Sequence, residues 1–222
     1  MTDISILKKL FKNKDLLNQA LTHKSWVNEH PNQRGTNERL EFLGDAILEF
    51  VVSQELYKNF PNKEEGYLTS LRANLVNTVN LAEISEKLSL GKEIFLSKGE
   101  DEGGGRKNQS LLADTLEAIV GALYLDQGLK AVEEFIHLNL LKDVGEKIKK
   151  PLKDAKSRFQ EYVQSKSMPT PRYQVVEETG PDHAKKFVVQ VLVSGNSIAK
   201  GSGKSKAEAE QTAAEAALNK LL

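Results

Sequence analysis

Three acidic residues, Glu38, Glu41 and Asp45, lie at positions i, i+3 and i+7 of one short stretch. In an α-helix of about 3.6 residues per turn, this spacing places all three on one face. Residues 46–52, which follow, are strongly apolar, so the acids border a protein core rather than an ordinary solvated surface. Stacked carboxylates repel one another, and hard divalent cations relieve this repulsion by binding carboxylate oxygens. The stretch therefore has the chemistry of a metal site.

A second acidic pair, Asp114 and Glu117, is spaced i and i+3 within the almost wholly apolar segment 111–125. Gly121, four residues after Glu117, continues the same helix face without a side chain. Burying two acids in such a segment is costly unless they have a partner. Solvent or salt bridges are one source of compensation, and the candidate counter-ions are Arg39, Arg72 and Arg106.

The accumulation of acids on two apolar helices favours a shared metal site over separate salt bridges. Hard divalent cations take carboxylate oxygens as ligands, so one ion could compensate several of these acids. The predicted metal ligands are Glu41, Asp45, Asp114 and Glu117.

Four blocks of the chain are similar to one enzyme family. Residues 37–45 look like the signature of ribonuclease III endonucleases, and residues 112–118 look like the second acidic motif of that family. Residues 65–76 resemble a third block, and residues 19–25 resemble the N-terminal block. The blocks occur in the family's order and spacing. Ala46 is a departure, because many members have serine there, but it removes no carboxylate.

The resemblance implies a Mg²⁺-dependent endoribonuclease, with Mn²⁺ able to substitute, that hydrolyses phosphodiester bonds of double-stranded RNA. It implies 5′-phosphate and 3′-hydroxyl ends with short 3′ overhangs, and substrates among ribosomal and other structured RNA precursors. Asp45 and Glu117 would be the catalytic residues, whereas Glu38 and Glu65 would position RNA or hold water near the metal. Whether one or two ions bind stays open at this point.

The resemblance also implies a homodimer, in which Phe42 enters a socket on the partner subunit. Phe42 adjoins the acidic stripe, where a large apolar side chain has no evident reason to face metal and RNA. The alternative is that Phe42 packs in the core of its own subunit.

Composition limits the other possibilities. The absence of cysteine excludes disulfides, zinc-thiolate sites and thiol catalysis. The N-terminus has no apolar run like that of a signal peptide, and no stretch approaches the roughly 20 apolar residues of a membrane span. We therefore expect a cytoplasmic protein with no membrane partner. Residues 151–222 hold 11 Lys and Arg against 8 Asp and Glu, an excess of positive charge that suits phosphate binding.

The first part of the chain has the apolar periodicity of an all-α domain, which we place at residues 1–145. Helices are expected over 16–21, 40–56, 68–88, 111–125 and 129–141, and a mobile loop over the glycine-rich stretch 98–108. A lysine-rich linker follows at 146–153. His23 has no second histidine or acid nearby at ligand spacing, so we expect it to hold a helix end or a loop.

The remaining residues, 154–222, form a second domain of the α+β class. Helical periodicity over 155–166 is followed by β-branched segments at 172–178, 186–193 and 197–200, and then by an alanine-rich helix from about 205 to 222. This α-β-β-β-α order resembles a double-stranded RNA-binding domain.

Three landmarks of that domain predict RNA contacts. The opening helix would present side chains to a minor groove, the turn 180–183 would present an imidazole to the next one, and the flexible run 201–206 would bind phosphates with lysines and exposed backbone N–H groups. The predicted RNA-binding residues are Ser157, Gln160, Glu161, His183, Lys204, Ser205 and Lys206. Ala207 stands where the family often has another lysine, so we expect somewhat weaker, less salt-sensitive binding.

Two other functions stay open. One is a protein that binds duplex RNA without cutting it, which the C-terminal domain alone would support. The other is a metal-dependent DNase, which the expected contacts to RNA 2′-hydroxyls disfavour. The complete set of four acids favours the nuclease over the binding protein.

Overall fold

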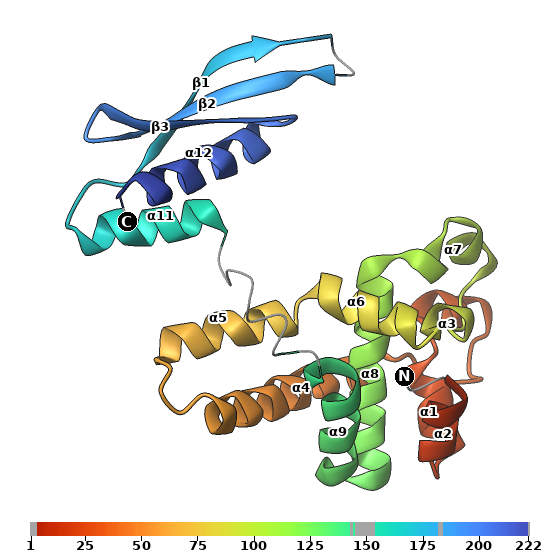
Figure 1. Ribbon diagram of the computed structural model, residues 1–222. Coiled ribbons are helices and arrows are strands. Elements are labelled where there is room, and N and C mark those ends of the chain that lie inside the picture. Colours follow the sequence, from red (N-terminus) through yellow and green to blue (C-terminus); the bar gives the residue numbers. More distant parts are fainter. Residues whose placement is uncertain (1–3, 143, 145–153, 182–183, 222) are drawn as a thin grey trace. The chain divides into compact units, whose positions relative to one another are not determined.

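The computed structural model describes residues 4–142, 144, 154–181 and 184–221, and the chain divides into two compact units, 1–150 and 151–222 (Figure 1). The predicted linker at 146–153 and the predicted domain end at residue 145 lie outside the described residues. No helix in the described ranges is long and apolar enough to cross a membrane.

The described part of the first unit is helical, as predicted. Its only β pairing within this range is an isolated bridge between Thr22 and Phe95. The α-helices are α1 (Ile4–Leu10), α2 (Lys14–Ala20), α3 (Lys24–Glu29), α4 (Glu38–Asn59), α5 (Glu65–Leu75), α6 (Thr78–Lys87), α7 (Lys98–Glu102), α8 (Gln109–Gln127) and α9 (Leu129–Ile136). Short 3₁₀ segments are η1 (Leu90–Lys92) and η2 (Gly105–Lys107), and a π-helical turn, η3 (His137–Leu141), continues α9.

Helix α8 lies at the centre of this unit, with α2, α4, α6 and α9 packed against it (Figure 1). It buries apolar side chains on nearly every side, from Leu111 to Leu123. A helix that is apolar all round is stable only when other elements cover it. The half-buried acids Asp114 and Glu117 are therefore held on a helix that other helices surround.

Helices α4 and α8 touch through their backbones. A Cβ atom added at Gly44 would overlap the carbonyl oxygen of Glu117, and one added at Gly121 would overlap the carbonyl oxygen of Leu40. Only glycine allows two helix backbones to approach this closely. The contact fixes the acidic face of α4 beside the acidic face of α8.

The single helix predicted over 68–88 is wrong, because the structure divides it into α5 and α6. The break lies at Val76–Asn77, where the Asn77 side chain accepts a hydrogen bond of 2.9 Å from the backbone N–H of Asn80. Asparagine is a favoured N-cap because its side-chain oxygen satisfies such an orphan N–H group. The apolar period continues across the break, so periodicity alone did not reveal it.

The mobile loop predicted over 98–108 is also wrong, because these residues form α7 and η2. Arg106 holds the segment in place. Its Nε and Nη2 donate to the two carboxylate oxygens of Asp101 at 2.7 and 2.8 Å. Its Nη1 donates to the carbonyl oxygens of Gly91, Lys92 and Ile94 at 2.9, 3.2 and 3.1 Å. The hydrogen bonds of this one guanidinium therefore hold a segment in place whose glycines alone would favour a mobile loop.

We expect an Arg106→Gln variant to lose about 2–3 kcal/mol of unfolding free energy, because it leaves the partly buried carbonyls of Gly91 and Ile94 without their donor. Urea denaturation would measure this loss. Lys98→Gln is the matched control, since Lys98 reaches Glu102 at 3.8 Å on an exposed surface and such pairs contribute less than about 0.5 kcal/mol. Equal midpoints for the two variants would contradict the assigned role of Arg106.

The second unit has the predicted α-β-β-β-α order: α11 (Ala155–Ser165), β1 (Arg172–Thr179), β2 (Lys186–Val193), β3 (Asn196–Gly203) and α12 (Lys206–Leu221). The strands form one antiparallel sheet in the order β1-β2-β3, and both helices lie on one face of it (Figure 1). The core between sheet and helices consists of Phe159, Val163, Val189, Val191, Val193, Ala209, Ala213, Ala214, Ala217 and Leu218.

Strand β3 extends further than the sequence indicated. It includes Gly201 and Gly203, although the sequence predicts a flexible run there. Gly201 is buried, and a Cβ atom there would overlap the backbone nitrogen of Ala213 in α12. The glycines therefore allow the alanine-rich helix to lie close to the sheet, which is a packing role.

Candidate functional site

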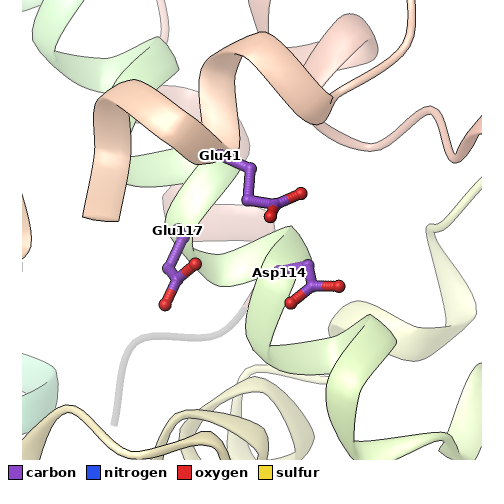
Figure 2. Close-up of side chains that lie close together, drawn as sticks. All are labelled: Glu41, Asp114 and Glu117. Atoms are coloured by element: carbon purple, nitrogen blue, oxygen red, sulfur yellow. The ribbon is translucent and has the colours of Figure 1, made fainter. Parts of the chain in front are cut away.

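Three carboxylates converge where α4 crosses α8. Glu41 extends from α4, and Asp114 and Glu117 extend from α8, one turn apart (Figure 2). One oxygen from each of the three lies within 4.8 Å of the others, and all three side chains are half-buried. Because the backbones touch at Gly44 and Gly121, the separation of the three carboxylates is set by the helix crossing rather than by flexible loops.

The electrostatics of this cluster favour a cation. Burial, together with the charges of Asp45, Asp114 and Glu41, raises the pKa of Glu117 to about 8. Burial and the charge of Asp114 also raise the pKa of Glu41, and burial raises the pKa of Asp114. A divalent cation would reverse these shifts by attracting the charged forms. An all-oxygen donor set suits hard cations such as Mg²⁺ and Mn²⁺.

Counter-ions from arginine, the alternative explanation for the acids, do not reach the cluster. Arg106 donates to Asp101, and Arg72 donates to Ser53 at 3.0 Å. Arg39 is exposed. Within the described ranges, no salt bridge involves any of the three clustered carboxylates.

Asp45, the fourth predicted ligand, does not belong to the group of three carboxylates that approach within 4.8 Å. Its side chain is exposed, one turn beyond Glu41 on α4. Its charge is nevertheless the largest carboxylate contribution that raises the pKa of Glu117, so it lies near that residue. A role for Asp45 as ligand and catalytic residue stays a prediction.

Glu38 and Glu65, predicted to position RNA, have other partners in the structure. Glu38 accepts from Lys24 Nζ at 3.4 Å and from Thr36 Oγ1 at 3.2 Å. Glu65 starts α5, accepts from Thr69 Oγ1 at 2.8 Å, and lines a groove of about 560 Å³ between α4 and α5. Neither belongs to the cluster of three carboxylates. Their predicted contacts with RNA stay predictions.

The raised pKa of Glu117 predicts how metal-free stability depends on pH. A carboxyl group whose pKa rises from 4.5 when unfolded to about 8 when folded adds stability below pH 4.5 and loses it as pH rises through 8. In EDTA, the melting temperature of the wild type should therefore fall by a few degrees more than that of Glu117→Gln between pH 5 and pH 9. Parallel melting curves of the two proteins over this range would contradict the shift.

Phe42 is 81% exposed, so the alternative that it packs in the core of its own chain is wrong. It shares one face of α4 with Phe50 and Tyr57, which are 54% and 76% exposed. Residues eight and fifteen positions apart fall on the same side of a helix. This row of three aromatic side chains is an apolar surface that the described residues of the first unit leave uncovered.

His23 caps a helix, as predicted. It is the N-cap of α3, and its Nδ1 accepts the backbone N–H of Ser25 at 3.3 Å. The structure also brings His23 near enough to Asp114 for each to affect the pKa of the other, which the sequence did not reveal. The two residues are distant in sequence, and no local motif connects them. Burial lowers the pKa of His23 more strongly than nearby acids such as Glu100 raise it.

The predicted minor-groove residues Ser157, Gln160 and Glu161 are all exposed on α11. Ser157 donates its hydroxyl to the Asp154 carboxylate at 2.8 Å, so its proton is already used in capping the helix. Hydrogen bonds from Gln211 and Ser157 lower the pKa of Asp154 to about 2, and this cap therefore stays charged near neutral pH.

At the start of α12, Lys204, Ser205 and Lys206 are exposed, as RNA contacts require. The prediction of free backbone N–H groups there is wrong for two of them. The Lys204 N–H donates to the Glu208 carboxylate at 2.7 Å, and the Glu208 N–H donates to Ser205 Oγ at 3.2 Å. This arrangement resembles a capping box, except that the Glu208 carboxylate accepts the N–H of Lys204 rather than that of Ser205. Phosphate binding would therefore rest on the lysine side chains. His183 lies outside the described residues.

Comparison with protein families gives two matches that together span most of the chain. Residues 13–144 match a family model described as Ribonuclease-III-like, and residues 155–221 match the double-stranded RNA binding motif. Both ranges agree with the two units of the structure in order and type.

Individual relatives agree with these matches. The chain is 47% identical to Ribonuclease 3 of Natranaerobius thermophilus over 99% of this chain and 96% of the relative. It is also 47% identical to Ribonuclease 3 of Caldanaerobacter subterraneus subsp. tengcongensis, over 95% and 93%. Among solved structures, the nuclease domain of ribonuclease III from Campylobacter jejuni matches with a TM-score of 0.56 and 39% identity, covering 68% of this chain and 99% of that domain. A second structure of that domain matches with a TM-score of 0.55 and 42% identity, covering 60% of this chain and 95% of that domain. It is reported as showing structural flexibility in a region involved in dimer formation.

Proposed function

The chain belongs to the ribonuclease III family, and from this membership we propose that it cleaves double-stranded RNA by hydrolysis at the cluster of Glu41, Asp114 and Glu117. The convergence of these three carboxylates is the observation that supports the proposal most strongly. A protein that only bound RNA would have no reason to bury mutually repelling acids beside its core.

Mg²⁺ is the proposed cofactor, with Mn²⁺ able to replace it. Glu41, Asp114 and Glu117 would hold the ion through carboxylate oxygens, and Asp45 would join them directly or through water. When bound, such an ion lowers the pKa of a water ligand and neutralises charge that develops on the phosphate. The protein contributes a rigid, half-buried arrangement of negative charge, and Asp45 and Glu117 are the proposed catalytic residues.

The second unit would bring duplex RNA to this cluster. Gln160 and Glu161 would reach 2′-hydroxyls in a minor groove, and Lys204 and Lys206 would bind phosphates. Ser157, Ser205 and His183 complete the proposed RNA contacts, while Glu38 and Glu65 would position RNA at the nuclease unit.

We also propose that the protein acts as a homodimer. The related Campylobacter jejuni nuclease domain has a region involved in dimer formation, and the exposed row of Phe42, Phe50 and Tyr57 offers an apolar surface for such contact. Two sites would then cut the two strands, leaving 5′-phosphate and 3′-hydroxyl ends with short 3′ overhangs. Ribosomal and other structured RNA precursors are the proposed substrates.

The test is incubation of the full chain with a long end-labelled RNA duplex and Mg²⁺. We expect staggered cuts that cease in EDTA and are restored by excess Mg²⁺ or Mn²⁺, with products that carry 5′-phosphates. A DNA duplex of the same sequence serves as a control for the DNase alternative. Tight RNA binding without cuts, by folded protein in Mg²⁺, would place the protein in the binding class and refute the proposal.

Phosphate binding by Lys206 predicts a change in salt dependence. A Lys206→Ala variant should bind duplex RNA more weakly at all sequences, and the slope of log affinity against log salt should fall by about 1. Fluorescence anisotropy at several salt concentrations measures this slope. Lys166→Ala, on an exposed residue that follows α11, is the control and should leave the slope unchanged. An unchanged slope for Lys206→Ala would remove this residue from the phosphate contacts.

A further inference from the structure

Helices α11 and α12 pack against each other on one face of the sheet, and each carries one of the proposed sets of RNA contacts (Figure 1). The minor-groove residues lie on α11, and the phosphate-binding lysines lie at the start of α12. A duplex presents its grooves and phosphates at fixed spacings. Both sets can therefore bind one duplex only if the two helices keep one alignment.

Apolar packing fixes this alignment only weakly. Of the five buried residues of α12, four are alanines and the fifth is Leu218. They pack in one core with Phe159 and Val163 of α11. Helices align through side-chain ridges that fit into grooves, and a row of methyl groups forms only shallow ridges. Directional hydrogen bonds between the helices therefore carry much of the alignment.

Gln211, a half-buried residue of α12, bonds to the first turn of α11 with both ends of its amide. Its Nε2 donates to Asp154 Oδ1 at 2.9 Å, and its Oε1 accepts the backbone N–H of Lys156 at 3.2 Å. Asp154 is the N-cap of α11 and also accepts the backbone N–H of Ser157 at 3.0 Å. One side chain of α12 thus holds the cap and the first turn of the helix that carries the minor-groove residues.

A second contact joins the same ends of the helices. Lys156 Nζ lies 2.6 Å from Glu210 Oε2. A lysine is a point charge on a flexible stem, so this ion pair restricts the geometry less than the planar amide of Gln211 does. Glu210 and Gln211 follow Lys206 by four and five residues, which is a little over one helical turn. Both contacts thus act close to the phosphate-binding end of α12.

We propose that Gln211 is a positioning residue for duplex RNA. By aligning the N-terminal ends of α11 and α12, it lets the minor-groove residues and the phosphate-binding lysines engage one duplex at the same time. The inference rests on the RNA contacts proposed above for the second unit. Contacts held on one rigid body bind together more tightly than they do separately, because the second forms at a high effective concentration.

Two substitutions separate positioning from stability. Gln211→Ala removes both amide bonds, and alanine is the best helix former, so α12 stays helical. Tyr162→Phe is the matched control. Tyr162 Oη donates to the Leu221 carbonyl at 3.0 Å, which joins the same two helices at their C-terminal ends. We expect both variants to melt a few degrees lower than the wild type, and only Gln211→Ala to change RNA binding.

Binding of the full chain to a duplex RNA would be measured by fluorescence anisotropy in Ca²⁺ at several salt concentrations. We expect Gln211→Ala to bind about tenfold more weakly, a small part of the roughly 10²–10⁴-fold gain that linked contacts can give. The slope of log affinity against log salt should fall by about 1, although no lysine is removed. In Mg²⁺, KM for cleavage should rise by about the same factor at unchanged kcat. Tyr162→Phe should match the wild type in each quantity.

A double-variant cycle with Lys206→Ala gives a readout that stability alone would not change. In the wild type, Lys206→Ala removes a phosphate contact that is made together with the minor-groove contacts. In the Gln211→Ala chain the two sets no longer engage together, so Lys206→Ala should weaken binding by a smaller factor there. A smaller factor would support the proposal.

The inference is overturned if Gln211→Ala binds RNA with the affinity and salt slope of the wild type, or if Tyr162→Phe lowers both as much. It is also overturned if Lys206→Ala weakens binding by the same factor in both chains. Failure of the proposed function would look different, because the wild type itself would then neither bind nor cleave duplex RNA.

Discussion

A Glu117→Gln variant is expected to lose at least about 10³-fold in the rate of RNA cleavage while it stays folded. A loss of this size corresponds to about 4 kcal/mol of transition-state stabilisation. Glutamine keeps the shape of the side chain on α8 but removes the charge on which the metal site depends. Because burial and neighbouring acids raise the pKa of Glu117 to about 8, the neutral glutamine relieves repulsion in the metal-free protein only as pH rises toward and above that value.

Single-turnover cleavage of an end-labelled duplex would measure this loss, with circular dichroism to show that the variant is folded. Duplex binding in Ca²⁺ or EDTA should be close to that of the wild type, since the proposed RNA contacts lie elsewhere. Glu83→Gln, on the exposed side of α6, is the matched control and should cleave normally. If Glu117→Gln cleaved within about tenfold of wild type, the cluster would not be the catalytic centre.

A Gly121→Ala variant is expected to lose about 3 kcal/mol or more of unfolding free energy, together with nearly all cleavage activity. The added Cβ atom would overlap the carbonyl oxygen of Leu40, a backbone atom that cannot rotate away. Helices α4 and α8 must separate to accept it, and overpacking of this kind costs about 1–3 kcal/mol or more. Separation also moves Glu41 away from Asp114 and Glu117, so residual folded protein should bind metal weakly.

Urea denaturation and Mn²⁺ titration would measure both effects on the same preparation. Gly66→Ala is the control, because nothing lies within 4 Å of a Cβ atom at that position in α5. There the change should be neutral or stabilising by up to about 1 kcal/mol, as expected for alanine replacing glycine in a helix. A Gly121→Ala protein as stable and active as Gly66→Ala would show that the close approach of the helices is not required.

Each acidic pair could be predicted from the sequence because its geometry is local. Asp114 and Glu117 share a face wherever residues 109–127 are helical, and Glu38, Glu41 and Asp45 do so on α4. The α-β-β-β-α order of the second unit could be predicted for the same reason, since the change from helical period to β-branched segments is visible along the chain.

Packing decided what these motifs could not. The contact of Gly44 with Gly121 decides which acids come together. It brings Glu41 to Asp114 and Glu117 on α8, whereas Asp45 stays outside this cluster of three carboxylates. Contacts between distant residues also explain why the mobile loop predicted at 98–108 is wrong. The glycines there suggested mobility, but the hydrogen bonds of Arg106 hold the segment in place.

The sequence by itself therefore determined the residue types, their helix faces and the order of the elements, because spacing along a chain fixes neighbours within one helix or strand. Only the tertiary structure decided which faces meet. Distances between helices depend on contacts between residues far apart in sequence, such as Leu40 with Gly121 and Gly44 with Glu117. No local period encodes such contacts, and the chemistry of the proposed site depends on them.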